Sequence, residues 1–72
     1  MGTKNNPGHF DCYANAEPDE PMFILLARDP DAPTLVELWA NIRERIGEDP
    51  AKTLEARFCA ENMRNWRTEN RS

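Results

Sequence analysis

Two helices and the turn between them can be read from residues 34–50, TLVELWANIRERIGEDP. Gly47 supplies the left-handed conformation that ends many helices. Asp49 followed by Pro50 has the pattern of an N-cap and a first helical position. A connection of residues 47–49 is short enough to require antiparallel packing of the flanking helices. The segment therefore predicts an α-helical hairpin.

The first helix is predicted over residues 32–46. Thr34 and Glu37 match a capping box, in which a hydroxyl and a carboxylate satisfy free amide groups of the first turn. Asp29 or Asp31 could instead cap an earlier start. Apolar side chains at spacings of three and four form one narrow stripe along this helix. These residues are Leu35, Leu38, Trp39, Ile42 and Ile46.

The second helix is predicted over residues 50–67. Its apolar residues spread over a wide arc, so this helix is expected to contact more than one surface. Glu55 and Asn62 fall within that arc. A polar residue there lies at a wet edge, in a hydrogen-bonded interface or in a ligand site. The apolar residues are Leu54, Phe58, Cys59, Met63 and Trp66.

A short β element is predicted over residues 9–28, before the hairpin. Residues 22–27, MFILLA, form a continuous apolar run bounded by Pro21 and Arg28, which is typical of a strand buried on both faces. A lone strand leaves its backbone groups unpaired, so this one needs a partner. The partner could be residues 9–13 folded back as a hairpin, or the same strand of a second copy.

Residues 1–8 are polar and show no periodicity, which predicts a mobile tail. Residues 9–72 then form a single small domain that is mainly α, with the β element followed by the helical hairpin. A 72-residue chain buries only a modest share of its surface, and small scaffolds are usually stabilised by disulfides, a metal or a second subunit. We therefore expect a homo-oligomer.

The composition indicates an acidic cytoplasmic protein. Its net charge of −4 argues against direct nucleic-acid binding, because DNA binders neutralise phosphates with Lys and Arg. No apolar run reaches the roughly 18 residues of a membrane span, and the first residues lack the apolar core of a signal peptide. We expect Cys12 and Cys59 to be free thiols in a reducing compartment, and we expect no membrane contact.

Residue types that catalysis or a metal centre would need are sparse. His9 is the only histidine, and together with Cys12 and Cys59 it gives three ligands where a structural zinc site normally has four. A nucleophile needs a positioned base beside it, and His9 follows a segment expected to be mobile. The sequence therefore predicts no enzyme, no cofactor and no metal.

Arginine and tryptophan residues near the end of the chain are the candidate ligand contacts. Trp66 lies beside Arg64 and Arg67, and an aromatic face with guanidinium groups can stack a base and grip a phosphate. The same residues also suit a tryptophan that caps the core, with arginines favoured at a helix C-terminus. Arg28 could bind an anion or pair with nearby acids. The predicted ligand-binding residues are Arg28, Glu55, Asn62, Arg64, Trp66 and Arg67.

Residues 15–29, NAEPDEPMFILLARD, are followed by Ala32-Pro33 and by residues 35–40, LVELWA. In this, residues 12–66 resemble a family of short, uncharacterised phage and prophage proteins, with a Pro-Asp-Glu-Pro segment, an apolar strand ending in Ala-Arg-Asp, and a helix bearing Trp-Ala. The family has no assigned catalytic or binding residues. The resemblance implies a phage origin and the cytoplasm of a bacterial host.

A phage origin favours two functions for a small acidic protein without catalytic motifs. The first is counter-defence by sequestration, in which an oligomer holds a nucleotide immune signal in pockets between subunits. The second is an anti-CRISPR-like protein that blocks a host defence protein through Glu17, Asp19 and Glu20, which otherwise form a solvated arm. A structural or regulatory phage component is a third. A DNA-binding regulator ranks last, because Glu55 and Glu61 would lie on its recognition helix. We favour sequestration.

Overall fold

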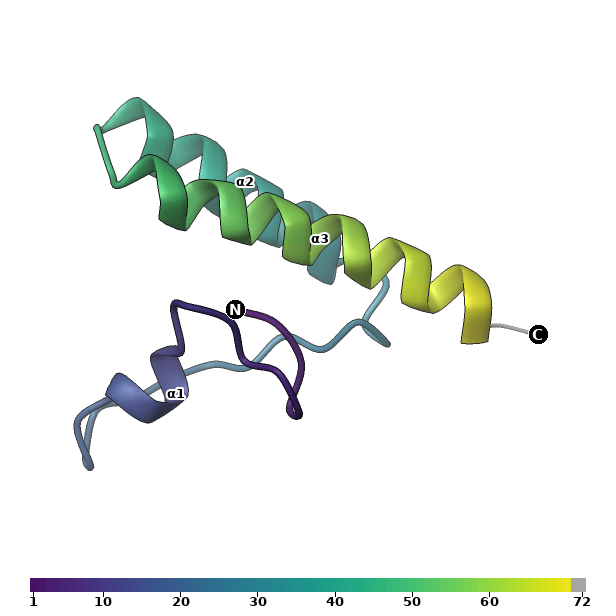
Figure 1. The fold of residues 1–72 in the computed structure, drawn as a ribbon, viewed down its shortest axis with the longest axis horizontal. Helices are drawn as coiled ribbons and strands as arrows, with labels where there is room; N and C mark the ends of the chain where they lie inside the picture. The colour runs from purple at the N-terminus through teal and green to yellow at the C-terminus, as the bar shows by residue number, and fades with distance from the viewer. Residues whose placement is uncertain (71–72) are drawn as a thin grey trace.

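The computed structural model describes residues 1–70 and contains three helices joined by irregular segments (Figure 1). α1 spans Cys12–Asn15, α2 spans Ala32–Arg45 and α3 spans Pro50–Asn70. α2 and α3 lie side by side and antiparallel, which confirms the predicted helical hairpin. Among the described residues, no helix is both long and apolar enough to cross a membrane.

α2 starts at Ala32, before the capping box predicted at Thr34, and the Asp31 side chain at the N-cap position makes no capping hydrogen bond. Asp31 occupies the N-cap position and Pro33 lies in the first turn, where the missing N–H of a proline has no intrahelical partner to lose. The Asp29 carboxylate accepts a hydrogen bond from the Asp31 N–H at 3.0 Å. A tight turn at Asp29 therefore directs the chain into α2.

The turn between α2 and α3 has the predicted form. Gly47 has a φ of 85°, and its N–H and that of Glu48 donate to carbonyl groups in the last turn of α2. The Asp49 carboxylate accepts a hydrogen bond from the Ala51 N–H at 3.0 Å, as expected of an N-cap. The second helix then continues to Asn70, three residues beyond its predicted end.

Small residues form the seam between the two helices. Ala40 on α2 and Ala56 and Ala60 on α3 are fully buried, and Thr53 is 3% exposed. Residues 53, 56 and 60 are spaced by three and four, so they share one face of α3. Since these side chains are short, the seam buries little apolar area.

The apolar stripe of α2 lies on the opposite side of this helix from the seam. Leu38 and Ile42 are each two residues from Ala40, which is about 200° around the helix, and they are 53% and 45% exposed. Leu35 and Ile46 are 45% and 64% exposed. Trp39, the fifth residue of the stripe, is half-buried, and the Lys52 amino group on α3 lies 5.8 Å from its ring centroid. The four aliphatic residues that identify this helix in the sequence are therefore not the ones that pack in the hairpin.

The expected N-terminal β element is absent from the described part of the chain, which contains no strand. Within residues 9–13, Asp11 instead caps the short helix α1 by accepting a hydrogen bond from the Ala14 N–H at 3.2 Å. Residues 22–27 run as irregular chain, and Phe23 is 85% exposed. A strand needs a hydrogen-bonded partner, and the local capping of α1 removes the partner expected within the chain, at residues 9–13.

Residues 1–8, predicted to be a mobile tail, form a loop that lies against α3. Glu55 on α3 accepts hydrogen bonds from the His9 N–H at 2.7 Å and the Phe10 N–H at 2.9 Å. The amino group of Met1 lies 3.6 Å from the same carboxylate. One acidic side chain therefore joins the start of the chain to the hairpin.

Candidate functional site

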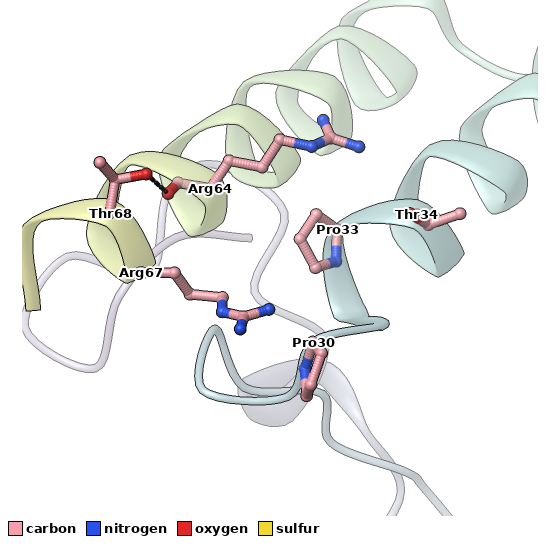
Figure 2. Close-up of a pocket in the computed structure, with 6 residues that line it drawn as sticks. All are labelled: Pro30, Pro33, Thr34, Arg64, Arg67 and Thr68. Carbon is pink, nitrogen blue, oxygen red and sulfur yellow. Dashed lines mark hydrogen bonds between the residues drawn. The ribbon is translucent and has the colours of Figure 1, made fainter. Parts of the chain in front are cut away.

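A surface hollow of about 340 Å³ lies where the start of α2 meets the last turns of α3 (Figure 2). The N–H groups of the first turn of α2 form the positive end of that helix dipole. The Thr68 hydroxyl donates to the carbonyl oxygen of Arg64 at 3.0 Å and so closes the α3 side. The lining residues are Pro30, Pro33, Thr34, Arg64, Arg67 and Thr68.

Arg67 is the cation of this hollow. Figure 2 shows its guanidinium directed toward Pro30 and Pro33. The side chain is half-buried, and none of the ion pairs among residues 1–70 includes it. Because a guanidinium stays charged at any ordinary pH, the hollow combines a cation with a helix N-terminus, which is an arrangement that attracts anions.

Arg64 holds the hairpin together at the edge of the same hollow. Its two terminal nitrogens donate to the two carboxylate oxygens of Glu37 at 2.8 and 2.5 Å. This hydrogen bonding raises the pKa of Arg64 and lowers the pKa of Glu37 from its ordinary value. An anion in the hollow would have to compete with Glu37 for Arg64, whereas Arg67 needs no such exchange.

A second ion pair repeats this contact further along the hairpin. Arg57 donates to Glu44 at 2.5 Å and to Asn41 at 3.1 Å. Glu37 and Glu44 are seven residues apart, as are Arg57 and Arg64, so both pairs lie on one side of the hairpin. The two pairs fix the alignment of the helices and thereby the position of the hollow.

Glu55 and Asn62 lie away from this hollow. Both line a second one, of about 290 Å³, between α3 and the N-terminal loop. The hydrogen bond from the His9 N–H, followed by that from Phe10, lowers the pKa of Glu55. The carboxylate is therefore engaged in holding the loop.

Trp66 and Arg28 line neither hollow. Trp66 is 47% exposed on α3. Arg28 is exposed in the turn that follows residues 22–27. The structure thus divides the predicted ligand residues among separate places, and of these residues it brings only Arg64 and Arg67 together at the first hollow.

The acidic residues of the alternative site share one tight turn. Glu17, Asp19 and Glu20 are all exposed. The Glu20 N–H donates to the Glu17 carbonyl at 3.1 Å, and the Glu20 carboxylate accepts from the Glu17 N–H at 3.0 Å. In Figure 1 this turn follows α1 and lies at a distance from α2 and α3. Its carboxylates face solvent.

The two cysteines are separate thiols. Cys12 is exposed and Cys59 is half-buried. Burial raises the pKa of the Cys59 thiol, so it stays protonated near neutral pH and behaves as a small apolar side chain. Within residues 1–70, no three His, Cys, Asp or Glu side chains are grouped as ligands of a metal ion.

Four residues that give the first hollow its shape were not predicted as site residues from the sequence. Pro30, Pro33, Thr34 and Thr68 carry no charge and no catalytic chemistry, so nothing in their type marks them. The feature of the sequence that could have predicted their position is the short connection of residues 47–49. Counting outward from that turn along both helices brings the start of the first helix beside the last third of the second.

Comparisons with protein-family models, curated proteins and solved structures give no match. The function is therefore inferred from the contacts and charges of the chain's own residues.

Proposed function

We propose that the protein is a non-enzymatic phage protein of counter-defence, which sequesters an anionic nucleotide signal in a homo-oligomer. The observation that supports this best is Arg67, a half-buried arginine without an ion-pair partner in residues 1–70, directed into the hollow at the start of α2. Sequestration requires binding without turnover. A cation in a hollow whose described lining residues include no histidine, cysteine or carboxylate suits that requirement.

In this proposal a phosphate group of the ligand occupies the hollow. Arg67 donates paired hydrogen bonds to it, because a planar guanidinium matches two phosphate oxygens at once. Thr34 also lines the hollow, and the dipole of α2 adds favourable potential. Pro30, which is exposed, supplies apolar surface against which a sugar or base can pack.

The oligomer supplies the rest of the ligand contacts. High-affinity pockets cover most of the surface of a small ligand, and one hollow formed by six residues covers only part of a nucleotide. Trp66, which precedes Arg67 on α3, keeps 47% of its surface exposed and is available to stack a base.

Native mass spectrometry of the protein, alone and mixed with a panel of cyclic and linear nucleotides, tests this proposal. We expect an oligomer that retains one class of nucleotide in a fixed ratio and returns it chemically unchanged. Arg67→Ala should weaken retention about tenfold or more, because a hydrogen bond to a charged group contributes roughly 1.5–3 kcal/mol.

Lys4→Ala is the matched control, since Lys4 is exposed on the N-terminal loop and the variant has the same net charge as Arg67→Ala. It should retain the nucleotide as the parent chain does. Equal retention by the Arg67→Ala variant would move the site elsewhere. A chain that retains no member of the panel would contradict sequestration.

The acidic turn supports a second candidate function, an anti-CRISPR-like protein that blocks a host defence protein. Glu17, Asp19 and Glu20 present three exposed carboxylates on one turn, and such a patch would steer the protein toward a basic, nucleic-acid-binding surface. Replacing the three acids with their amides should abolish capture of the host protein in a pull-down and leave nucleotide retention unchanged. Capture that survives the triple replacement contradicts this candidate.

A further inference from the structure

We infer that a second copy of this chain covers the apolar stripe of α2, with the two α2 helices antiparallel. The aliphatic residues of the stripe form the contact: Leu35, Leu38, Ile42 and Ile46. The inference rests on the homo-oligomer of the proposed function and deepens it by naming the surface and orientation of the subunit contact. It holds with or without a bound nucleotide.

The stripe is the most apolar face of α2, yet the hairpin leaves it uncovered. Its four aliphatic side chains are between 45% and 64% exposed, whereas Ala40, on the opposite face, is fully buried against α3. Because the two faces lie on nearly opposite sides of the helix, about 160° apart, another helix can pack on the stripe while the hairpin stays closed.

The spacing of the stripe is that of a helix-to-helix contact. Leu35, Leu38 and Ile42 are separated by three and four residues, which is the a, d, a pattern of a coiled coil. Asp31 and Arg45 continue the same pattern, four residues before Leu35 and three after Ile42. All five residues therefore share one face of α2.

Asp31 and Arg45 set the orientation. Each lies seven residues from Leu38, at opposite ends of the stripe. Both are exposed, and no ion pair within residues 1–70 includes either one. Antiparallel pairing brings an acid near a base at both ends, whereas parallel pairing brings like charges together, which is unfavourable. The helix dipoles favour the antiparallel arrangement as well.

The pattern also fits a second copy, because it is self-complementary. In an antiparallel pair about a two-fold axis at Leu38, Leu38 lies opposite Leu38 of the second copy, Leu35 lies level with Ile42 to within one residue, and Asp31 lies opposite Arg45. Large aliphatic side chains then meet at the three central levels, and each charged end meets its opposite. A closed two-fold contact requires this kind of match between a surface and itself.

The first test is sedimentation or light scattering of the full chain carrying Leu38→Glu. This change places a charge at the centre of the contact, and we expect association at least about tenfold weaker than in the parent chain. Leu54→Glu is the matched control, because Leu54 is 52% exposed on α3 and lies outside the stripe. The control should associate as the parent does, and circular dichroism should show equal helix content in all three chains.

A charge exchange tests the orientation and does not depend on the folding of the Leu38→Glu variant. Asp31→Arg and Arg45→Asp should each weaken association, and the chain carrying both should regain it. The double variant keeps both local changes within α2, so its recovery can come only from the contact between copies. With parallel helices, each single change would leave a like-charged pair and the double variant would gain nothing.

Three results would overturn the inference: a parent chain that is monomeric at high concentration, association unaffected by Leu38→Glu, or a double charge variant weaker than both single variants. Nucleotide retention by a monomeric parent chain would overturn the contact alone and leave the ligand site in place. An associating chain that retains no nucleotide would overturn the ligand site and leave the contact in place.

Discussion

Arg64 on α3 holds Glu37 on α2 through two parallel hydrogen bonds, one to each carboxylate oxygen. Seven residues along each helix, Arg57 pairs with Glu44 at 2.5 Å. Two glutamates meet two arginines of equal spacing, so both pairs form in only one alignment of the antiparallel helices. The short side chains of the alanine seam interlock little, so they do not define one alignment of the helices. The ion pairs therefore select the alignment that positions Arg67.

Reversing one charge of the first pair should destabilise the hairpin. Glu37→Arg would place two guanidinium groups together, but Glu37 and Arg64 are 42% and 46% exposed, so solvent screens much of the effect. We expect the melting temperature to fall by no more than roughly 5 °C. The exchange Glu37→Arg with Arg64→Glu should recover most of the loss in thermal melts. Equal melting of the single and double variants would show that this pair does not select the alignment.

Acid should weaken the contact between the N-terminal loop and α3. Hydrogen bonds from the N–H groups of His9 and Phe10 lower the pKa of Glu55, and Arg64 lowers the pKa of Glu37. A lowered folded-state pKa contributes stability above the ordinary glutamate pKa of about 4.3, and that contribution is lost as pH falls through the folded pKa. The melting temperature should therefore stay level from neutral pH to about pH 5 and decline below about pH 4.

Glu55→Gln separates the two contributions to this acid response. The amide cannot titrate, so the decline in melting temperature should become shallower, with Glu37 supplying the remainder. Amide exchange at Phe10 should also become faster at neutral pH, because the variant loses the charged acceptor of that N–H. Unchanged exchange would show that Glu55 does not hold the loop.

The hairpin could be predicted because its signals are local. Gly47 ends α2 through the left-handed conformation of its own backbone, and Asp49 caps the helix that starts at the next residue. The strand predicted at residues 22–27 depended on a distant partner, which no local signal provides. The apolar run identified residues that favour burial, and in the single chain Phe23 remains 85% exposed. What an apolar run packs against cannot be read from the run itself.

The site was predicted in part, for a similar reason. Arg67 was identifiable because an arginine near a tryptophan suggests recognition of an anion and a base. Glu55 was also singled out as a polar residue on an apolar arc, but its partners are backbone N–H groups of His9 and Phe10, which every residue type except proline provides. A side chain that binds backbone leaves no matching residue in the sequence.

Enlarging a seam residue should separate the helices. Ala60 is fully buried, so Ala60→Leu forces three extra carbon atoms between α2 and α3 and should cost about 1–3 kcal/mol of stability in denaturant unfolding. Ala51→Leu is the matched control on the same helix, because Ala51 is exposed and leucine is nearly as good a helix former as alanine. Equal stability of the two variants would show that the alanines do not form the seam.

Adding a side chain at Gly47 should destabilise the protein through the backbone alone. Its φ is 85°, a conformation that costs an L-residue roughly 1–2 kcal/mol, and a Cβ at this position would meet nothing within 4 Å. Gly47→Ala should therefore lower the free energy of unfolding by about 1 kcal/mol, and Gly47→Asn by less, because asparagine tolerates the left-handed region. D-Alanine at the same position, introduced by chemical synthesis, also adds a methyl group, but a D-residue favours the positive φ that Gly47 adopts. It should raise stability by about 0.4–1 kcal/mol by restricting the unfolded chain. If D-alanine destabilised the protein as much as L-alanine does, the cost would come from a clash, and the left-handed turn would not be what joins α2 to α3.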